Sequence, residues 1–249
     1  MTNPNAKLEE VTQRLRIQYN ELAELAGSLA HEIKNPLSVI RMNMELLAED
    51  FADAQTPEER RALTKIETVQ KQCTRLENLL RDFLKFARLR DLELSPGSLN
   101  EVVDRVLNFF EPQAKQSEVE FIRFLDPALP SIKLDEQTLH AALLNLVKNS
   151  LEAMPDGGQL LARTRLTRQG VALDLIDTGC GMDQQTALKM FETFFSTKQG
   201  GSGLGLPTAR KIIEGHGGRI DVQSAAGRGT KFTLEFPLPA RLTGSGGPA

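Results

Sequence analysis

The stretch Ser28-Leu29-Ala30-His31-Glu32-Ile33-Lys34-Asn35-Pro36 places an imidazole beside a carboxylate in a segment whose neighbours are patterned for helix packing. Upstream, apolar residues recur three and four positions apart from Leu8 to Leu29, the spacing of a coiled-coil seam. In this register His31 lies next to the seam, so its side chain can stay in water while packing holds its helix. Taken alone, the His-Glu pair favours an ordinary surface histidine, and the rest of the chain has to decide its role.

A second seam indicates a helical hairpin. The helix of His31 is predicted over residues 8 to about 50, and Thr56 and Pro57 suit the cap and first position of another helix. Apolar residues again recur at heptad spacing from Ile66 to Ala87, with Cys73 as a small core residue. Because an antiparallel hairpin cannot bury both seams by itself, we expect two copies to form a dimeric four-helix bundle. The alternative is a hairpin that lies on the rest of the same chain.

The composition changes near Leu94-Ser95-Pro96-Gly97, which predicts a domain boundary. We expect a helical domain over residues 1–95, a second domain over 96–239 and a flexible tail over 240–249. The order of helices and strands in the second domain predicts a two-layer α/β sandwich, so the fold class of the chain is α+β. Its helices are expected at about 99–115, 136–154 and 206–214, and its strands at about 119–125, 132–134, 159–167, 171–177, 219–224 and 230–236.

The bulk composition excludes several classes of function. A formal net charge of -3 and the absence of tryptophan argue against a nucleic-acid partner. No apolar run approaches the roughly 20 residues that span a bilayer, and the first residues lack a signal-peptide core, so we expect a cytoplasmic chain without a membrane segment. Its input would come from an upstream sensory protein or domain. Cys73 and Cys180 form no Cys-x-x-Cys pair, so neither a disulfide nor a zinc site is indicated.

Two asparagines on one predicted helix suggest a metal and phosphate site. Asn145 and Asn149 are four residues apart, so their amides lie on one face of the helix, with Lys148 on the adjoining surface. Carboxamide oxygens are hard ligands for Mg²⁺, and an ammonium can offset phosphate charge. Taken alone, the pair could equally be two solvated asparagines.

Two glycine-rich segments follow this helix. Asp177-Thr178-Gly179-Cys180-Gly181 places a carboxylate at the end of a strand, beside glycines that let another backbone or a flat ligand approach closely. The segment from Gly200 to Leu206 leads into a helix at Pro207, where backbone N–H groups and the helix dipole converge on an anion. Its spacing is not that of a Walker A loop, and a flexible linker is the alternative for its first glycines.

With these motifs in this order, the chain resembles the transmitter region of two-component sensor histidine kinases, from about residue 20 to 238. Each motif is weak individually, and the six together are specific. The H-box is matched by His31-Glu32-Ile33-Lys34-Asn35-Pro36, the N-box by residues 145–149, the first glycine box by Asp177-x-Gly179-x-Gly181, the F-box by residues 191–195, the second glycine box by Gly201-x-Gly203-Leu204-Gly205-Leu206 and a further glycine motif by residues 227–230.

The resemblance implies a protein-histidine kinase that uses ATP and Mg²⁺ and acts as a homodimer. His31 would attack the γ-phosphate of ATP and pass the phosphoryl group to an aspartate of a response-regulator receiver domain. Glu32 would serve as the base, and Asn35 would orient water for dephosphorylation of the partner. His140 and His216 match no catalytic role and are expected to be structural.

The same resemblance implies the roles in the nucleotide site. Asn149 and Asn145 would hold Mg²⁺, Lys148 and Lys198 would neutralise phosphate charge, and Asp177 would accept the adenine amino group. Hydrolytic relatives of this ATP-binding fold carry a water-activating glutamate at the position of Asn145, so water attack should be slow here. The other nucleotide-binding positions are Gly179, Gly181, Gly201, Gly203, Leu204, Gly205, Leu206 and Thr230.

Two rival functions remain open. The first is a signalling scaffold that binds nucleotide and transfers nothing, against which the intact His31, Glu32, Asn149 and Asp177 weigh. The second is an ATPase or serine kinase on the same sandwich, which leaves the His-Glu-x-x-Asn-Pro motif unexplained. The sequence does not decide whether kinase or phosphatase activity dominates, nor whether phosphate crosses between subunits.

Overall fold

The computed structural model describes residues 27, 29–30, 32–87, 92–198 and 200–238. The chain divides into two units, Met1–Arg88 and Leu89–Ala249, and each is described by itself. His31, the helix predicted before residue 27 and the predicted tail over 240–249 lie outside the described residues.

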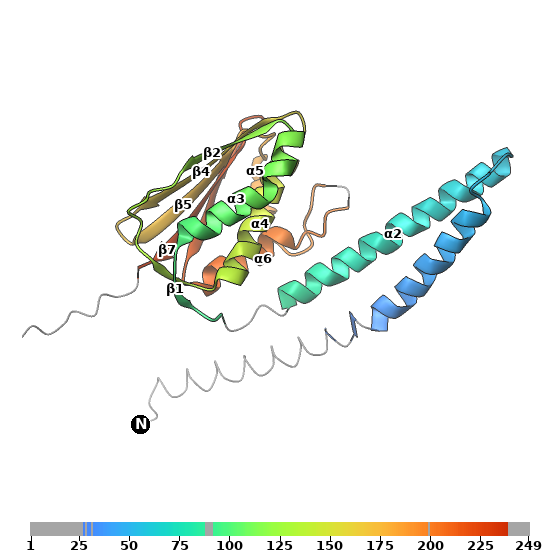
Figure 1. The fold of residues 1–249 in the computed structure, drawn as a ribbon, viewed down its shortest axis with the longest axis horizontal. Coiled ribbons are helices and arrows are strands. Elements are labelled where there is room, and N and C mark those ends of the chain that lie inside the picture. The colour runs from blue at the N-terminus through green and yellow to red at the C-terminus, as the bar shows by residue number, and fades with distance from the viewer. Residues whose placement is uncertain (1–26, 28, 31, 88–91, 199, 239–249) are drawn as a thin grey trace, which may run out of the picture. The chain divides into compact units, whose positions relative to one another are not determined.

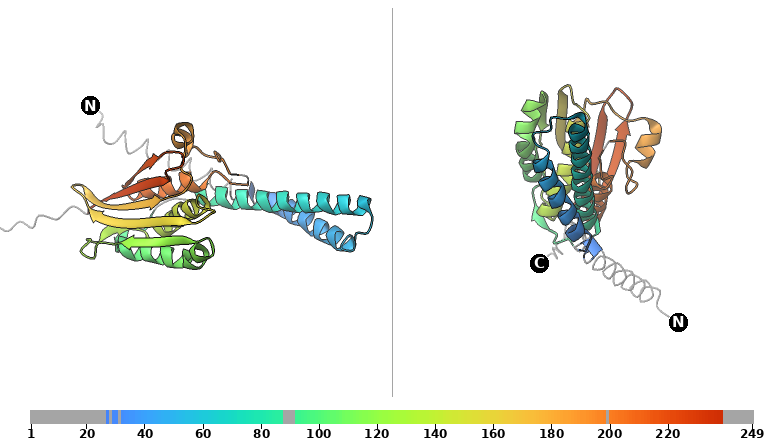
Figure 2. Two further views of the ribbon diagram at one scale, coloured as in Figure 1. Left: turned by 90° about the horizontal axis from the view of Figure 1, so that it is seen from above. Right: turned by 90° about the vertical axis from the view of Figure 1, so that its right-hand side faces the viewer.

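The N-terminal unit contains the predicted hairpin. Residues 32–50 are helical and run antiparallel to α2 (Pro57–Ala87), and the two helices lie side by side in Figures 1 and 2. α2 begins with a reciprocal cap, because the Thr56 N–H donates to the Glu59 carboxylate at 3.0 Å and the Glu59 N–H donates to Thr56 Oγ1 at 3.2 Å. Arg41 Nε lies 3.6 Å from Glu77 Oε1 and connects the two helices. The start of α2 at Pro57 is confirmed.

Only part of the α2 seam is buried. Ile66 and Cys73, seven residues apart, are buried, whereas Val69 and Leu76 are 39% and 49% exposed. On the facing helix Leu37 is buried, while several other large apolar side chains, among them Ile40 and Leu46, are exposed. An apolar strip is therefore left uncovered on the described part of the hairpin, which is the kind of surface that another chain usually covers.

The C-terminal unit is a sandwich of one helical layer and one sheet. Helices α3, α4 and α6 cover one face of a five-stranded sheet with the order β2-β4-β5-β7-β6 (Figure 1). β2 and β4 are parallel, and the other neighbouring strands are antiparallel. The elements are β1 (Ser95–Gly97), α3 (Leu99–Gln116), β2 (Val119–Phe124), β3 (Ile132–Leu134), α4 (Glu136–Glu152), β4 (Gly158–Leu166), β5 (Gly170–Asp177), α5 (Gln184–Lys189), α6 (Gly205–Gly215), β6 (Arg219–Ser224) and β7 (Thr230–Pro237).

The predicted sandwich is confirmed, and its predicted elements agree with the structure to within about two residues. Two short elements were not predicted, namely β1, which pairs antiparallel with β3, and α5. None of the helices in the described part of the chain combines the length and the hydropathy that a bilayer-spanning segment needs.

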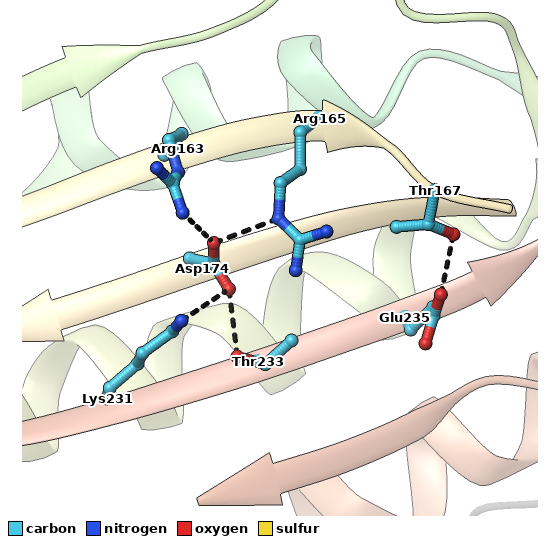
Figure 3. A network of polar contacts seen from close by, with 7 residues as sticks. All are labelled: Arg163, Arg165, Thr167, Asp174, Lys231, Thr233 and Glu235. Atoms are coloured by element: carbon cyan, nitrogen blue, oxygen red, sulfur yellow. Dashed lines mark hydrogen bonds and ion pairs between the residues drawn. The ribbon is translucent and has the colours of Figure 1, made fainter. Parts of the chain in front are cut away.

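The two faces of the sheet carry different side chains. On the helix side, Leu173 and Leu175 of β5 are buried in the main core. On the other side, Asp174 is fully buried beneath charged neighbours (Figure 3). Its Oδ2 accepts hydrogen bonds from Arg163 at 2.8 Å and Arg165 at 3.2 Å. The sheet therefore contains a buried carboxylate that is paired with two arginines of the neighbouring strand β4.

His216 fixes the position of α4 relative to α6. The buried ring accepts a hydrogen bond at Nε2 from the Asp135 N–H at 3.0 Å, and its Nδ1 lies 2.8 Å from the Ile212 carbonyl oxygen. This pairing requires the tautomer with the proton on Nδ1. Asp135 in turn caps α4 by accepting from the Thr138 N–H at 3.1 Å. The last turn of α6 is thus joined to the first turn of the helix that carries the two asparagines.

Candidate functional site

A buried carboxylate marks the end of β5. Asp177 is 3% exposed, and its Oδ1 accepts from the backbone N–H groups of Gly179 and Thr230, both at 3.0 Å. Its Oδ2 accepts from the Ser150 hydroxyl at 3.1 Å. Burial raises the pKa of Asp177, although these hydrogen bonds and the charge on Lys198 act in the opposite direction. Since a carboxylate oxygen accepts two hydrogen bonds, Oδ2 retains capacity for one further donor.

The glycines of the first glycine box allow backbone segments to approach one another closely. A Cβ on Gly179 would lie 2.7 Å from the Ala153 carbonyl oxygen, and a Cβ on Gly181 would lie 2.1 Å from that of Ala225. Gly181 also has a φ of 62°, which favours glycine. Of the two possibilities that the sequence left open, the approach of another backbone is therefore the one observed.

Two polar side chains of α4 bind the ammonium group of Lys198. Lys198 Nζ donates to Asn149 Oδ1 at 3.1 Å and also to the Glu152 carboxylate. The other carboxylate oxygen of Glu152 lies 3.8 Å from Lys148 Nζ. The structure thus brings together three of the predicted residues, Lys148, Asn149 and Lys198, with Glu152, which the sequence analysis did not single out.

The N-terminus of α6 lies against Asn145. The amide oxygen and Cγ of Asn145 are 3.7 Å from the point where a Cβ on Gly205 would stand. The N-cap residue of this helix, Leu204, provides no side-chain cap, so N–H groups of the first turn can donate to an anion. Leu204 is buried and Leu206 packs against the core. These two anchors distinguish the segment from a flexible linker.

The described residues of the loop before α6, 190–198 and 200–204, are joined by a contact between the two ends of the loop. The Phe194 N–H donates to the Gly203 carbonyl oxygen at 3.0 Å. Gly203 has a φ of 65°, and a Cβ there would lie 2.4 Å from the Phe194 carbonyl carbon. A Cβ on Gly201 would lie 2.3 Å from Ser196 Oγ. Both glycines therefore permit close contacts within this loop, which carries Lys198 and is called the lid segment below.

The H-box residues belong to the N-terminal unit. Glu32 and Asn35 are exposed on the helix over residues 32–50. His31 lies outside the described residues. The roles assigned to His31, Glu32 and Asn35 therefore stay predictions.

The amide cluster on α4 suits a magnesium ion better than a metal that needs a cage of protein ligands. In the part of the chain that the structure describes, no three His, Cys, Asp or Glu side chains gather as a metal site. The Asn149 amide oxygen already accepts from a cationic group. Mg²⁺ is usually held by few protein oxygens and takes its other ligands from phosphates and water. The donors on α4 fit that pattern.

Comparison with protein families first defines the class of the C-terminal unit. Residues 134–240 match the family described as Histidine kinase-, DNA gyrase B-, and HSP90-like ATPase. Residues 21–92 match the His Kinase A (phospho-acceptor) domain. The chain therefore carries the transmitter region of a two-component histidine kinase, with a phosphoacceptor helical part followed by an ATPase-like sandwich.

Named relatives agree with this assignment. The chain is 33% identical to the signal transduction histidine-protein kinase AtoS of Escherichia coli strain K12, over 91% of this chain and 37% of AtoS. It is 34% identical to the sensor histidine kinase ZraS of Klebsiella oxytoca, over 93% of this chain and 49% of ZraS. The chain thus spans less than half the length of these two relatives.

Solved structures share its fold. Full-length ShkA in complex with AMPPNP superposes with a TM-score of 0.66 at 28% identity, over 86% of this chain and 45% of ShkA. The histidine kinase ThkA in complex with the response regulator protein TrrA superposes with a TM-score of 0.64 at 26% identity, over 96% of this chain and 68% of ThkA.

Proposed function

We propose that this chain is a homodimeric protein-histidine kinase that binds ATP with Mg²⁺, phosphorylates its own His31 and passes the phosphoryl group to an aspartate of a response-regulator receiver domain. The observation that carries the proposal is the spare acceptor on the buried Asp177, in the same sandwich as the amide and ammonium groups of α4 and the lid segment. The Asp177 carboxylate suits adenine, and the amide and ammonium groups suit a charged triphosphate. The AMPPNP complex of ShkA and the TrrA complex of ThkA support the nucleotide and the partner.

Each group in the nucleotide site has a separate task. Asp177 Oδ2 accepts a hydrogen bond from the adenine amino group, which selects adenine over bases with a carbonyl at that position. Lys148 and Lys198 offset phosphate charge, and the uncapped start of α6 adds backbone donors. The amides of Asn145 and Asn149 hold Mg²⁺, which neutralises charge on the phosphates when it is bound.

The transfer step uses the imidazole as a nucleophile. A ring nitrogen of His31 forms a bond to the γ-phosphorus while the bond from that phosphorus to the bridging oxygen breaks, and ADP leaves. Glu32 accepts the proton that the ring releases. Glu32 also orients the ring for the attack. Asn145 cannot act as a base for water, so the γ-phosphoryl group is kept for His31.

Acid and alkali stability of the labelled protein tests this function. The chain is incubated with Mg²⁺ and γ-labelled ATP, beside a His31→Gln variant. We expect label on the wild-type protein that survives alkali, is lost in acid and is absent from the variant, because a phosphoramidate has this stability. Nucleotide binding without any label would favour the signalling scaffold, and label on the variant would assign the phosphoacceptor to another residue.

The uncovered part of the α2 seam predicts a dimer that a single charge disrupts. Replacing the exposed Leu76 by glutamate places a charge in the apolar strip beside Val69, so we expect the dimer to dissociate into the 27.5 kDa monomer. Sedimentation equilibrium measures the mass. Asn78→Glu adds the same charge at an exposed polar position of α2 and should remain dimeric. A wild-type protein that sediments as a monomer would instead favour a hairpin that packs within one chain.

A further inference from the structure

Glu152 occupies the centre of the charged groups at the C-terminal end of α4. One of its oxygens accepts from Lys198 Nζ, and the other lies 3.8 Å from Lys148 Nζ. The side chains of Glu152 and Lys198 are 37% and 41% exposed, so the pair is partly shielded from water. The function proposed above assigns both lysines to phosphate and gives Glu152 no role.

Lys198 contacts a second residue of α4 besides Glu152. Its ammonium also donates to Asn149 Oδ1, the amide oxygen proposed to hold Mg²⁺. A single lysine of the lid segment is thus held between a carboxylate and an amide, where nucleotide and metal ion are expected to bind. Phosphate oxygens and the Glu152 carboxylate are both acceptors for the same ammonium, so they compete for it.

We propose that Glu152 is a positioning residue that acts as an internal stand-in for the phosphates of ATP. In the nucleotide-free protein it holds Lys198 against Asn149 and thereby ties the lid segment to α4. When ATP binds, Lys198 moves from the carboxylate to the phosphates, and the amide oxygen of Asn149 becomes free. This inference rests on the proposed nucleotide site and adds to it a contact that must break during binding.

Nucleotide affinity gives the first test. Glu152→Gln removes the competing charge, so ATP should bind about twofold to fivefold more tightly by calorimetry, the range expected for partly exposed ion pairs. Adenosine, which has no phosphates, should bind unchanged. Glu136→Gln is the matched control, because Glu136 lies on the same helix, pairs with Arg105 and is 43% exposed. Unchanged or weaker ATP binding in Glu152→Gln would overturn the inference.

A second variant shows whether the effect passes through the lysine. In a Lys198→Met background, the gain from Glu152→Gln should largely disappear, because the ammonium group that donates to the carboxylate is gone and only the more distant Lys148 remains. A gain in ATP affinity of the same size in both backgrounds would assign the effect to general charge repulsion. It would refute the proposal that Glu152 stands in for the phosphates.

Hydrogen exchange of the lid segment supplies a readout that needs no nucleotide. Without ATP, amides of residues 192–198 and 200–204 should exchange faster in Glu152→Gln than in wild type or Glu136→Gln, because one tether of the segment is lost. Equal exchange in all three proteins would show that Glu152 does not hold the lid segment. Failure of the wild-type protein to bind ATP would refute the proposed function instead, and it would leave this comparison intact.

Discussion

Replacement of Asp177 by asparagine is expected to weaken ATP binding by about 100-fold or more while the fold is retained. The asparagine oxygen can still accept from the backbone N–H groups of Gly179 and Thr230, so the loop contacts survive. The amide nitrogen then stands where Oδ2 was, beside the Ser150 hydroxyl. There it presents N–H groups toward a ligand that also presents an N–H group, so an attractive contact becomes a repulsive one. Calorimetric titration with ATP measures the loss.

Base preference separates recognition from simple damage. Wild-type protein should prefer ATP strongly over inosine triphosphate, whose base has a carbonyl oxygen in place of the amino group, and Asp177→Asn should lose this preference. Asp183→Asn is the control, since Asp183 caps α5 from an exposed position and asparagine keeps the capping oxygen. ATP affinity within about threefold of wild type in Asp177→Asn would show that Asp177 only holds the loop together.

Local signals account for the elements that were predicted well. α2 and α4 have side-chain caps at Thr56 and Asp135, and both predicted starts are confirmed. Apolar periodicity then continues along each helix, so propensity and packing indicate the same structure. A helix of this kind can be placed from the sequence because the information lies within its own residues.

The two missed elements contain less of this information. β1 is only three residues long and contains Pro96 and Gly97. It forms because it pairs with β3, from which α3 and β2 separate it along the chain. α5 has six residues, none of them buried, so it shows no apolar period to recognise. β1 thus depends on a contact that the local pattern does not encode, and the cap at Asp183 is the local signal that α5 offers.

Some polar residues of the site could have been identified from the sequence, and others could not. Glu152 follows Lys148 by four residues and Asn149 by three, so helical spacing could have identified it as their neighbour. Ser150 reaches Asp177 only because the fold brings α4 to the end of β5, which no spacing in the sequence reveals. Likewise, the spacing around Gly179 did not indicate that the Ala153 carbonyl oxygen would be the group that approaches it.

The largest stability effect is expected from Asp174, on the sheet face that the helices do not cover (Figure 3). Besides the two arginines, Thr233 donates to its Oδ1 at 2.8 Å and Lys231 Nζ lies 3.5 Å from that oxygen. Burial by itself would raise the pKa of Asp174, but the hydrogen bonds from Arg163, Arg165 and Thr233 and the charge on Lys231 outweigh it and lower the pKa to about 2. The ionised carboxylate is therefore strongly favoured in the folded state.

The lowered pKa of Asp174 determines how the stability of the fold depends on pH. Since the folded pKa lies below the unfolded value near 3.9, ionised Asp174 stabilises the fold above about pH 4, by about 2.5 kcal/mol. That stabilisation is lost as the pH falls through about 2, where the carboxyl becomes neutral. Asp174→Asn should therefore lower the free energy of unfolding at pH 7 by about 2 to 3 kcal/mol, because three cations lose their counter-ion.

Urea denaturation at several pH values checks this prediction. The difference between wild type and Asp174→Asn should be full at pH 5 to 7 and should shrink as the pH falls from about 4 toward 2, since both side chains are then neutral. Asp221→Asn is the control, because Asp221 lies on the same sheet face and pairs with Arg219 at 3.5 Å while 63% exposed. That variant should stay within about 0.5 kcal/mol of wild type. A difference for Asp174→Asn that did not change with pH would mean that side-chain packing, and not the charge, makes this position important.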